Sequence, residues 1–563
     1  MPYTDTLAEA DRAVVTPRNG GGNPPDPAQL EAQGDLIGAL AAYTEKIAVD
    51  PSDPSSWTRI GMILVRLMKW QPAADNFRFV LSLDPNHAEA LHGLAISLYH
   101  LGESTEARSL ADAAADAAPT DWRIHATRAY IHATTLGDPA ATLAVYRDWA
   151  ARFADPLTDA STPLPRLRGA DASPTRRLRV GYVSGDLRQH SMAYFIEPVF
   201  ANHDKSQVEV FVYSTGRRDA VTERLQRHVP NWFNVAATND DDLLKLIRGH
   251  GIDVLVDLSG HTEGQRLFVF ARRAAPVQIT WLGFMHPLGM RAMDYRLTDC
   301  ETDGPGADAH YTETLFRLHC MASYAPPESP LLTTLPMQSN GFPTLISLNN
   351  SKKVTDRMLA VWGRILAART DAQLVIMVQE RTPEDAQAQM LPRLQRMGLP
   401  LDRIYVSPQL PLEEFMALGT VADVALDTSP VSGGTTTLHS LWMGLPVVTL
   451  DSPEAAEGST ARTLHALGCD DWVASDEDGY VQRALALLDS PEQLLAHRAG
   501  IRDRMSGSLL MDYAGRTREL EHAFRLMWIN HLLGERRFVR FDVPLDVAVA
   551  AAEAKAEARI GCA

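Results

Sequence analysis

The chain has 563 residues, 45% of them hydrophobic and 22% charged, which is an ordinary globular composition with room for about three or four domains. Its formal net charge of −17 argues against a nucleic-acid or anionic-membrane partner, because both need clustered lysine and arginine. It contains no apolar run of about 18 residues and does not start with a basic region followed by an apolar run, so we expect neither a membrane span nor a signal peptide.

Residues 1–26 are rich in glycine and proline near their end, and we expect a disordered arm there. A 34-residue period follows, typical of the tetratricopeptide repeat (TPR), a helix–turn–helix unit. It predicts a TPR array over 27–155, with units near 20–53, 54–87 and 88–121 and a degenerate fourth unit over 122–155. The array either binds a peptide or a domain along its concave face or acts as a structural cap. The residues in register are Ala39, Ala73, Ala107 and Ala141; Tyr43, Phe77 and Ala111; and Pro51, Pro85 and Pro119.

Residues 156–176 have the composition of a linker, and from Arg177 short β-rich runs alternate with helical periods. This alternation predicts two parallel sheets, hence two Rossmann-like α/β lobes, over 177–340 and 341–509. A closing helix is expected within 510–540, followed by a tail over 541–563. The predicted strands are 178–184, 208–214, 253–258, 277–283 and 294–298 in the first lobe, and 343–348, 373–379, 403–407, 423–428 and 446–450 in the second.

In the second lobe, polar segments follow three predicted strands, where a parallel sheet binds its ligands. The most informative is the segment 429–437, which carries Gly433, Gly434, Thr435 and Thr436 before an apolar helix. Glycines allow a ligand to approach the backbone, and a helix N-terminus suits phosphate oxygens. An ordinary turn with threonine capping is the alternative. Asn350 and Lys353 follow the strand 343–348, and Leu410 follows 403–407; Lys353 either adds a positive charge at the phosphate site or is a solvated lysine.

In the first lobe, His190 follows the strand 178–184, and His261 follows 253–258. An imidazole at a strand's carboxyl end can take a proton or orient a sugar hydroxyl, although most histidines are structural. His286 is a weaker third candidate. No P-loop and no GxGxxG after the first strand are present, which argues against an ATPase or a dehydrogenase. The acidic run 476–478 is formally a DxD motif in a surface stretch, and we expect no metal site there.

The four cysteines indicate neither a zinc site nor a disulfide framework, because no two of them have CxxC spacing. The absence of a disulfide framework favours a reduced, cytoplasmic environment. The four are Cys300, Cys320, Cys469 and Cys562.

Together these segments resemble the TPR-containing O-GlcNAc transferase family and its bacterial relatives, over most of the chain. The residues that carry the resemblance are 178–186 with His190, 276–283, 293–295, 349–353, 426–428, 434–436 and 441–446. The resemblance implies a GT-B fold, a UDP-sugar donor, inversion at the anomeric carbon, and transfer to serine, threonine or, in some relatives, asparagine. We expect no metal or other cofactor, so Lys353 and backbone dipoles must offset the charge on the leaving diphosphate.

By resemblance, Lys353 matches the family's diphosphate-binding lysine, Thr435 and Thr436 its phosphate-contacting threonines, and His190 the histidine near the donor sugar. Asn350 stands where animal members have glutamine, and His439 where an acidic residue usually binds ribose. The sequence also departs from the animal pattern near the nucleotide, where Leu412 and Phe415 replace a lysine and a histidine and Gly434 replaces a histidine.

The leading hypothesis is therefore a glycosyltransferase that moves GlcNAc or another hexose from UDP to a protein or peptide, with the acceptor reaching the site by way of the TPR groove. Three alternatives remain open. They are a non-catalytic TPR adaptor with a degenerate transferase lobe, a transferase acting on a glycan, and another two-lobed nucleotide-sugar enzyme such as an epimerase. The products of the reaction distinguish them.

Overall fold

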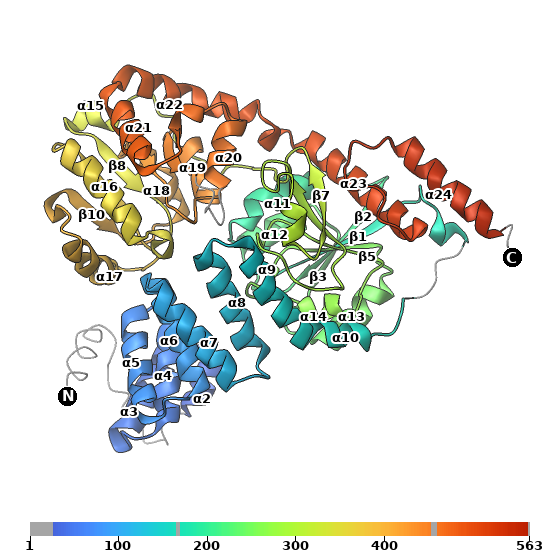
Figure 1. Ribbon diagram of the computed structural model, residues 1–563, viewed down its shortest axis with the longest axis horizontal. Helices are drawn as coiled ribbons and strands as arrows, with labels where there is room; N and C mark the ends of the chain where they lie inside the picture. Colours follow the sequence, from blue (N-terminus) through green and yellow to red (C-terminus); the bar gives the residue numbers. More distant parts are fainter. Residues whose placement is uncertain (1–25, 165–168, 452–458, 561–563) are drawn as a thin grey trace.

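The structure is a computed structural model that describes residues 26–164, 169–451 and 459–560. A helical array lies beside two α/β lobes, and a long helix runs back from the second lobe to the first (Figure 1). The arm expected over 1–26 falls almost wholly outside the described residues. No helix in the described part of the chain is both long enough and apolar enough to cross a bilayer.

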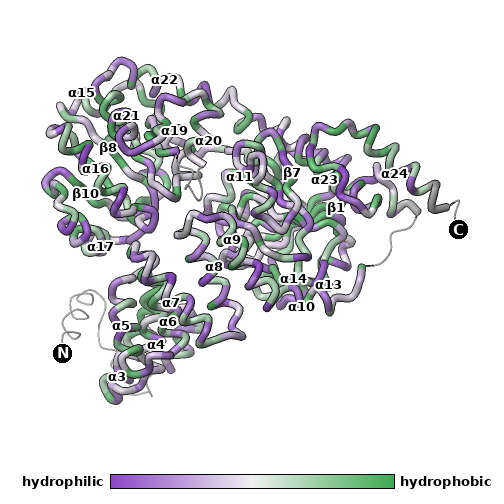
Figure 2. The backbone as a smooth tube through the Cα atoms, viewed as in Figure 1, coloured by the Kyte–Doolittle hydropathy of each residue, from purple (hydrophilic) through white to green (hydrophobic). Residues whose placement is uncertain are grey.

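The array consists of antiparallel helix pairs in the 34-residue register of the sequence. Small residues let the paired helices approach: a Cβ at Gly61 would lie 2.5 Å from the Phe77 ring, and one at Gly93 would lie 2.2 Å from it. Hydrophobic segments gather inside this bundle, and hydrophilic ones lie at its rim (Figure 2). The helices are α2 (Pro27–Ala32), α3 (Leu36–Val49), α4 (Pro54–Arg66), α5 (Trp70–Leu83), α6 (Ala88–Leu101), α7 (Ser104–Ala117), α8 (Trp122–Leu136) and α9 (Pro139–Trp149).

Helical structure continues beyond the last array helix toward the first lobe. A π-helical turn η1 (Ala150–Ala154) and the helix α10 (Asp155–Asp159) extend α9, and a short turn η2 (Gly169–Ala172) precedes the first strand. The segment expected as a linker over 156–176 is thus partly helical. Aromatic packing fixes the junction, because Trp149 stacks on Phe268 of the first lobe at 5.8 Å.

The first lobe is a seven-stranded parallel sheet in the order β3-β2-β1-β4-β5-β6-β7. Its order reverses between β1 and β4, and ligands of such sheets bind at that switch point. The sequence predicted five of these seven strands. β3 and β7 were not predicted, because they contain polar residues. The strands are β1 (Leu178–Ser184), β2 (Val208–Ser214), β3 (Asn231–Asn234), β4 (Val254–Asp257), β5 (Val277–Thr280), β6 (Tyr295–Asp299) and β7 (Thr314–Leu318). The helices are α11 (Met192–Asn202), α12 (Ala220–Gln226), α13 (Asp240–Gly249) and α14 (Leu267–Ala271), with the turn η3 (Ala307–His310).

The second lobe repeats this plan in six parallel strands, in the order β10-β9-β8-β11-β12-β13, with its switch point between β8 and β11. The strands are β8 (Thr344–Ser347), β9 (Gln373–Met377), β10 (Ile404–Ser407), β11 (Val424–Leu426), β12 (Val447–Leu450) and β13 (Val473–Ala474). The helices are α15 (Pro336–Asn340), α16 (Asp356–Ala368), α17 (Pro383–Arg396), α18 (Leu412–Met416), α19 (Thr435–Trp442), α20 (Ser459–Ala466), α21 (Glu477–Asp489) and α22 (Pro491–Ser506). Short turns are η4 (Ser351–Lys353), η5 (Leu401–Arg403), η6 (Leu418–Thr420), η7 (Asp470–Trp472) and η8 (Leu509–Met511).

Two boundaries differ from the sequence expectation. Helix α15 belongs to the second lobe rather than to the first, because the backbone N–H of Met337 donates to Asp423 and Leu335 lies in the second lobe's core. The expected tail contains α24 (Leu545–Ile560), whose Ala548 and Ala552 are buried against the first lobe. Alanine-rich sequence gave no clear amphipathic period, which is why this helix was missed.

The closing helix α23 (Tyr513–Leu533) leaves the second lobe and packs against the first (Figure 1). Leu520, Phe524, Met527 and Trp528 are all buried there. Since α24 covers part of α23, this helix has apolar neighbours on more than one face.

Candidate active site

The second lobe brings Lys353 and the glycine–threonine loop together at its switch point. The turn η4 follows β8, and the loop follows β11, so both leave neighbouring strands at the same edge of the sheet. Nζ of Lys353 donates a hydrogen bond of 2.8 Å to the carbonyl oxygen of Ser432. The juxtaposition expected from the sequence is therefore present, with the ammonium beside the loop that begins α19.

The loop reaches this position through Asp427, a buried carboxylate at the end of β11. Its Oδ1 accepts from the backbone N–H of Gly433 at 2.8 Å and from the side-chain amide of Asn349 at 2.9 Å, and its Oδ2 accepts from Thr449 at 2.7 Å. The carboxylate thus joins the loops after β8, β11 and β12. Sequence reasoning gave Asp427 no role of its own, although one acidic residue at the end of an apolar strand was the available signal.

Gly433 is required by the tightness of this packing. A Cβ there would lie 2.4 Å from Oγ1 of Thr437 and 3.2 Å from Oδ1 of Asn349. Its carbonyl oxygen accepts hydrogen bonds from Ser459 and from Thr460 at the start of α20. The loop is therefore held from two sides.

Helix α19 begins at Thr435 without a side-chain cap, because its N-cap residue is Gly434. Thr435 and Thr436 are half-buried in the first turn, and Gly434 is likewise only half-buried. Uncapped N–H groups of a first helical turn carry partial positive charge and suit an anion. With Lys353 at the same switch point, this end of α19 can hold phosphate oxygens.

The remaining predicted residues of this lobe have different positions. Oδ1 of Asn350 accepts from the backbone N–H of Lys352 at 3.2 Å and so shapes η4. Leu410 follows the edge strand β10 and packs against the lobe's hydrophobic core. Leu412 and Phe415 are also partly buried against that core.

His439 lies at the junction between the lobes. Its Nδ1 is hydrogen-bonded to the hydroxyl of Tyr324 at 2.6 Å, and its ring meets Tyr194 of α11 edge-on at 4.8 Å. Burial lowers the pKa of His439 to about 4, so the ring is neutral at physiological pH. The structure thus gives this residue packing partners from both lobes.

His190 stands at the switch point of the first lobe, directly before α11. Its Nδ1 accepts from the backbone N–H of Met192 at 3.2 Å and lies 3.8 Å from a carboxylate oxygen of Asp186. The side chain is 41% exposed. Desolvation lowers the pKa of His190, and the charge of Asp186 opposes that shift. The neutral ring therefore carries its proton on Nε2 in this structure and presents a hydrogen-bond donor.

His261 belongs to a different environment. Its ring packs against Tyr146 at 4.7 Å and Trp149 at 4.5 Å, both on α9 of the array. Its Nε2 lies 3.4 Å from the carbonyl oxygen of Leu288, which can only accept, so Nε2 carries the proton. Burial lowers the pKa of His261 to about 3. His286, the weaker candidate, is buried.

The loop that carries His261 also reaches the surroundings of His190. The buried Asp257 at the end of β4 accepts from the backbone N–H groups of Ser259 and Gly260, much as Asp427 does in the second lobe. Burial raises the pKa of Asp257 to about 6. The same loop packs on Gly185, where a Cβ would lie 2.7 Å from the carbonyl oxygen of Glu263.

A cleft of about 670 Å³ opens where the three units meet. Its walls come from α6 and α8 of the array, from the first-lobe loop 261–265 and from Lys352 of the second lobe. One end therefore adjoins η4 with Lys353, and another adjoins the loop beside Asp186 and His190. A segment of polypeptide in this cleft would contact all three units.

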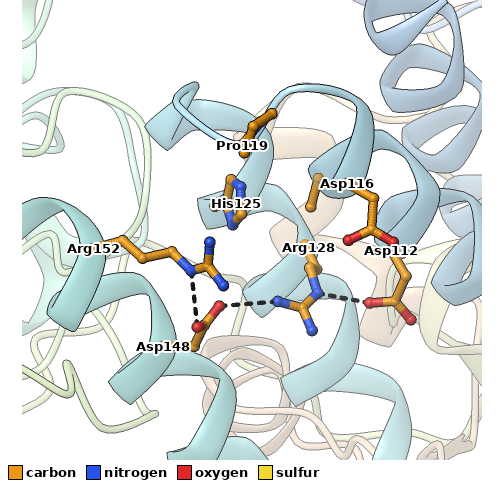
Figure 3. Close-up of a pocket in the computed structure, with 8 residues that line it drawn as sticks. Asp112, Asp116, Pro119, His125, Arg128, Asp148 and Arg152 are labelled. Atoms are coloured by element: carbon orange, nitrogen blue, oxygen red, sulfur yellow. Dashed lines mark hydrogen bonds and ion pairs between the residues drawn. The ribbon is translucent and has the colours of Figure 1, made fainter. Parts of the chain in front are cut away.

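A second hollow, of about 410 Å³, lies on another face of α8 and is lined mainly by charged residues of the array (Figure 3). Arg128 bridges Asp112 and Asp148 there, at 2.6 Å and 3.2 Å. These pairs join α7, α8 and α9 and do not involve either switch point.

The acidic run 476–478 is structural. Asp476 caps α21 through the backbone N–H of Gly479 at 2.7 Å, and Glu477 and Asp478 pair with Arg357 and Arg364 of α16. Within 26–164, 169–451 and 459–560, no group of three or more His, Cys, Asp or Glu residues is arranged to hold a metal ion.

Two Rossmann-like lobes preceded by a TPR array have the architecture of the GT-B class of glycosyltransferases. The chain belongs to glycosyl transferase family 41: residues 166–322 and 335–520 match that family, and residues 64–131 match the tetratricopeptide repeat.

The structure superposes on a mutant of the O-GlcNAc transferase from Thermobaculum terrenum with a TM-score of 0.81 and 34% identity, covering 90% of this chain and 96% of that one. It is 35% identical over 409 residues to a tomato (Solanum lycopersicum) protein named "Probable UDP-N-acetylglucosamine--peptide N-acetylglucosaminyltransferase SPINDLY", covering 71% of this chain and 42% of that protein. The Arabidopsis thaliana protein of the same name is 34% identical over 398 residues, which is 69% of this chain and 43% of that protein. The chain thus spans less than half the length of these plant relatives.

Proposed function

We propose that the protein is an inverting glycosyltransferase that moves a sugar, GlcNAc or another hexose, from a UDP-sugar to a serine, threonine or asparagine side chain of a protein. The observation that carries this proposal is the hydrogen bond from Lys353 to Ser432, which fixes an ammonium group beside the open N-terminus of α19. The printed names of the relatives, which specify UDP-N-acetylglucosamine and peptide, support the same donor and acceptor classes.

The leaving group in such a transfer is a nucleoside diphosphate, and it gains negative charge as the bond to the anomeric carbon breaks. Lys353 and the first-turn N–H groups of α19 oppose that charge without reorganisation, because the loop is already held by Asp427, Ser459 and Thr460. These groups supply the charge stabilisation, and the proposed reaction requires no metal ion.

The acceptor chain would enter the cleft between the array and the lobes. His190 stands beside the loop that forms one wall, with Nε2–H available to a substrate oxygen. In the proposed reaction, the acceptor oxygen or nitrogen attacks the anomeric carbon from the face opposite the diphosphate, and its proton passes to a base. His190 can take that proton at Nε2 only after its own proton moves to Nδ1 and the hydrogen bond from the backbone N–H of Met192 to Nδ1 breaks. A carboxylate oxygen of Asp186, 3.8 Å from Nδ1, is then the available acceptor.

We place the reaction in the cytoplasm. Cys300, Cys320 and Cys469 are free thiols in the structure, which fits a reducing compartment.

Calorimetric titration of the whole chain with UDP, GDP and a panel of their sugars tests the proposal, followed by mass spectrometry of candidate acceptor proteins incubated with the sugar that binds. A bound UDP-sugar and an acceptor heavier by one sugar residue are the expected results. Absence of nucleotide binding would establish the adaptor alternative. Sugar on a glycan, or an epimerised free nucleotide sugar, would identify the other two.

A further inference from the structure

Lys352 and Lys353 are adjacent in the chain but serve different parts of the molecule. Lys353 faces the glycine–threonine loop, whereas Nζ of Lys352 lies 3.4 Å from the hydroxyl of Tyr130 on the TPR helix α8. The same ammonium lies 5.5 Å from the centroid of the Tyr130 ring and 5.3 Å from that of Tyr99 on α6. Two helices of the array therefore hold the residue next to the diphosphate-binding lysine.

We propose that Lys352 is a positioning residue that couples the TPR helices α6 and α8 to Lys353, so that occupation of the TPR cleft and binding of the nucleotide diphosphate affect each other. The proposal rests on the proposed function, because it takes Lys353 as a diphosphate ligand.

The turn between the two lysines is too short to absorb a displacement. η4 has three residues, and the backbone N–H of Lys353 donates to the carbonyl oxygen of Asn350 at 2.8 Å. The Asn350 side chain accepts from the backbone N–H of Lys352 at 3.2 Å. A shift of Lys352 toward or away from the array is therefore transmitted to Lys353.

Helix α8, which carries Tyr130, is itself held in place by neighbouring elements. On another face of α8, Arg128 pairs with Asp112 of α7 and Asp148 of α9 (Figure 3). At the start of α8, the Trp122 ring meets Phe268 of the first lobe edge-on at 5.2 Å. Tyr130 is thus anchored to the array and, through α8, to the first lobe. Through its contact with Tyr130, Lys352 connects the second lobe to the array and to the first lobe.

The same three side chains line the cleft in which an acceptor would lie. Tyr99, Tyr130 and Lys352 are all among its walls. A polypeptide that packs on the tyrosine rings would change the contacts of Lys352, and through η4 the position of Lys353. Linkage requires the reverse effect as well, so bound nucleotide would alter the affinity for an acceptor peptide.

Direct contact of Lys352 with a phosphate would be a different role, and a variant on the array side separates the two. Tyr130→Leu leaves every charge in place and removes only the ring and hydroxyl that hold Lys352. We expect it to weaken UDP binding by about threefold to tenfold, which is the range that an aromatic–ammonium contact supports. Lys352→Met should weaken binding by at least as much, and Lys352→Arg, which can still lie on the rings, should restore most of the affinity.

The decisive measurement is a double-mutant cycle on UDP affinity, by calorimetry of the full-length protein without an acceptor. If Lys352 carries the coupling, Tyr130→Leu has no further effect in the Lys352→Met background. Additive effects, or wild-type affinity in Tyr130→Leu, would overturn the proposal. Lys69→Met is the matched control, because Lys69 pairs with Asp385 across another contact between the array and the second lobe at 2.5 Å and should leave UDP affinity unchanged.

Two further results complete the design. Thermal unfolding of each variant shows whether it folds, and Tyr130→Phe, which removes only the hydroxyl, replaces Tyr130→Leu in the cycle if the latter is unfolded. If the wild-type protein binds neither UDP nor GDP, the proposed function itself fails. If the wild-type protein binds UDP or GDP and the double-mutant cycle is additive, only the proposed coupling through Lys352 is wrong.

Discussion

The ammonium of Lys353 and the carbonyl oxygen of Ser432 are 2.8 Å apart although 79 residues separate them in the chain. Their two loops leave β8 and β11, the pair of strands between which the order of the sheet reverses. The contact thus follows from the topology of a doubly wound sheet, which places both loops at one crevice.

Replacement of Lys353 by alanine is expected to abolish most of the transfer activity while the protein stays folded. Loss of a donor to the departing charge costs about 2–4 kcal/mol in such sites, which corresponds to a fall in kcat of about 30- to 1000-fold. Steady-state turnover with the sugar that binds, together with a thermal unfolding curve, measures both. Lys245→Ala removes a 77% exposed lysine of α13 and is the control. Wild-type turnover in Lys353→Ala would exclude the role.

Most of the fold could be predicted from sequence because its signals are local. The 34-residue period marks the helix pairs, and apolar runs such as 178–184 mark the buried strands. The strands that were missed, β3 and β7, carry polar or charged residues, and β13 has only two residues. Helix α24 was missed because it is rich in alanine, which packs closely without giving a strong apolar stripe.

The candidate site could be predicted in part. The rule that ligands bind beyond the carboxyl ends of parallel strands placed Lys353, Gly433 and His190 correctly at the switch points, because it depends on topology alone. The same rule points to His261, which lines the cleft, but the sequence does not show that Tyr146 and Trp149 of the array pack on this ring. Contacts between distant units, like those of Lys352 with the array, have no local signal.

Gly433 and Gly434 are expected to respond differently to the same change. Gly433→Ala would place a Cβ 2.4 Å from Oγ1 of Thr437, so the loop must move, at a cost of about 1–3 kcal/mol in stability and with weaker nucleotide binding. In Gly434→Ala the new Cβ meets, among the residues that the structure describes, only Oγ of Ser459 at 3.5 Å, an ordinary contact. Thermal unfolding and UDP titration of both variants test this, and equal behaviour of the two would contradict the geometry.

His190 can be tested as a base or as a hydrogen-bond donor. His190→Ala should slow turnover strongly in either case, whereas His190→Gln keeps an N–H donor and should retain activity only if donation is the role. If His190→Ala changes only the KM for the acceptor, the residue is not the base.

The Asp186 side chain supplies a second test of the same residue. Its charge raises the pKa of His190 against the larger, opposing effect of desolvation. Removing that charge in Asp186→Asn should therefore lower the pKa of His190 and move the acid limb of kcat/KM to lower pH. A limb that stays in place would show that another group titrates.

Acid is expected to weaken the junction between the lobes through His439. Its pKa is about 4 in the folded protein, held down by burial, against about 6.5 in the unfolded chain. Between these values the unfolded chain binds a proton that the native protein does not, so stability falls as pH falls, by about 1.4 kcal/mol per pH unit for this group.

His439→Gln removes the titration but can still accept from Tyr324, so its unfolding temperature should fall less between pH 6.5 and pH 5 than that of the wild type. His319→Gln, at a side chain 61% exposed, should follow the wild-type curve. Parallel curves for wild type and His439→Gln would mean that this ring is protonated in the folded protein, and the neutral contact with Tyr324 would then be wrong.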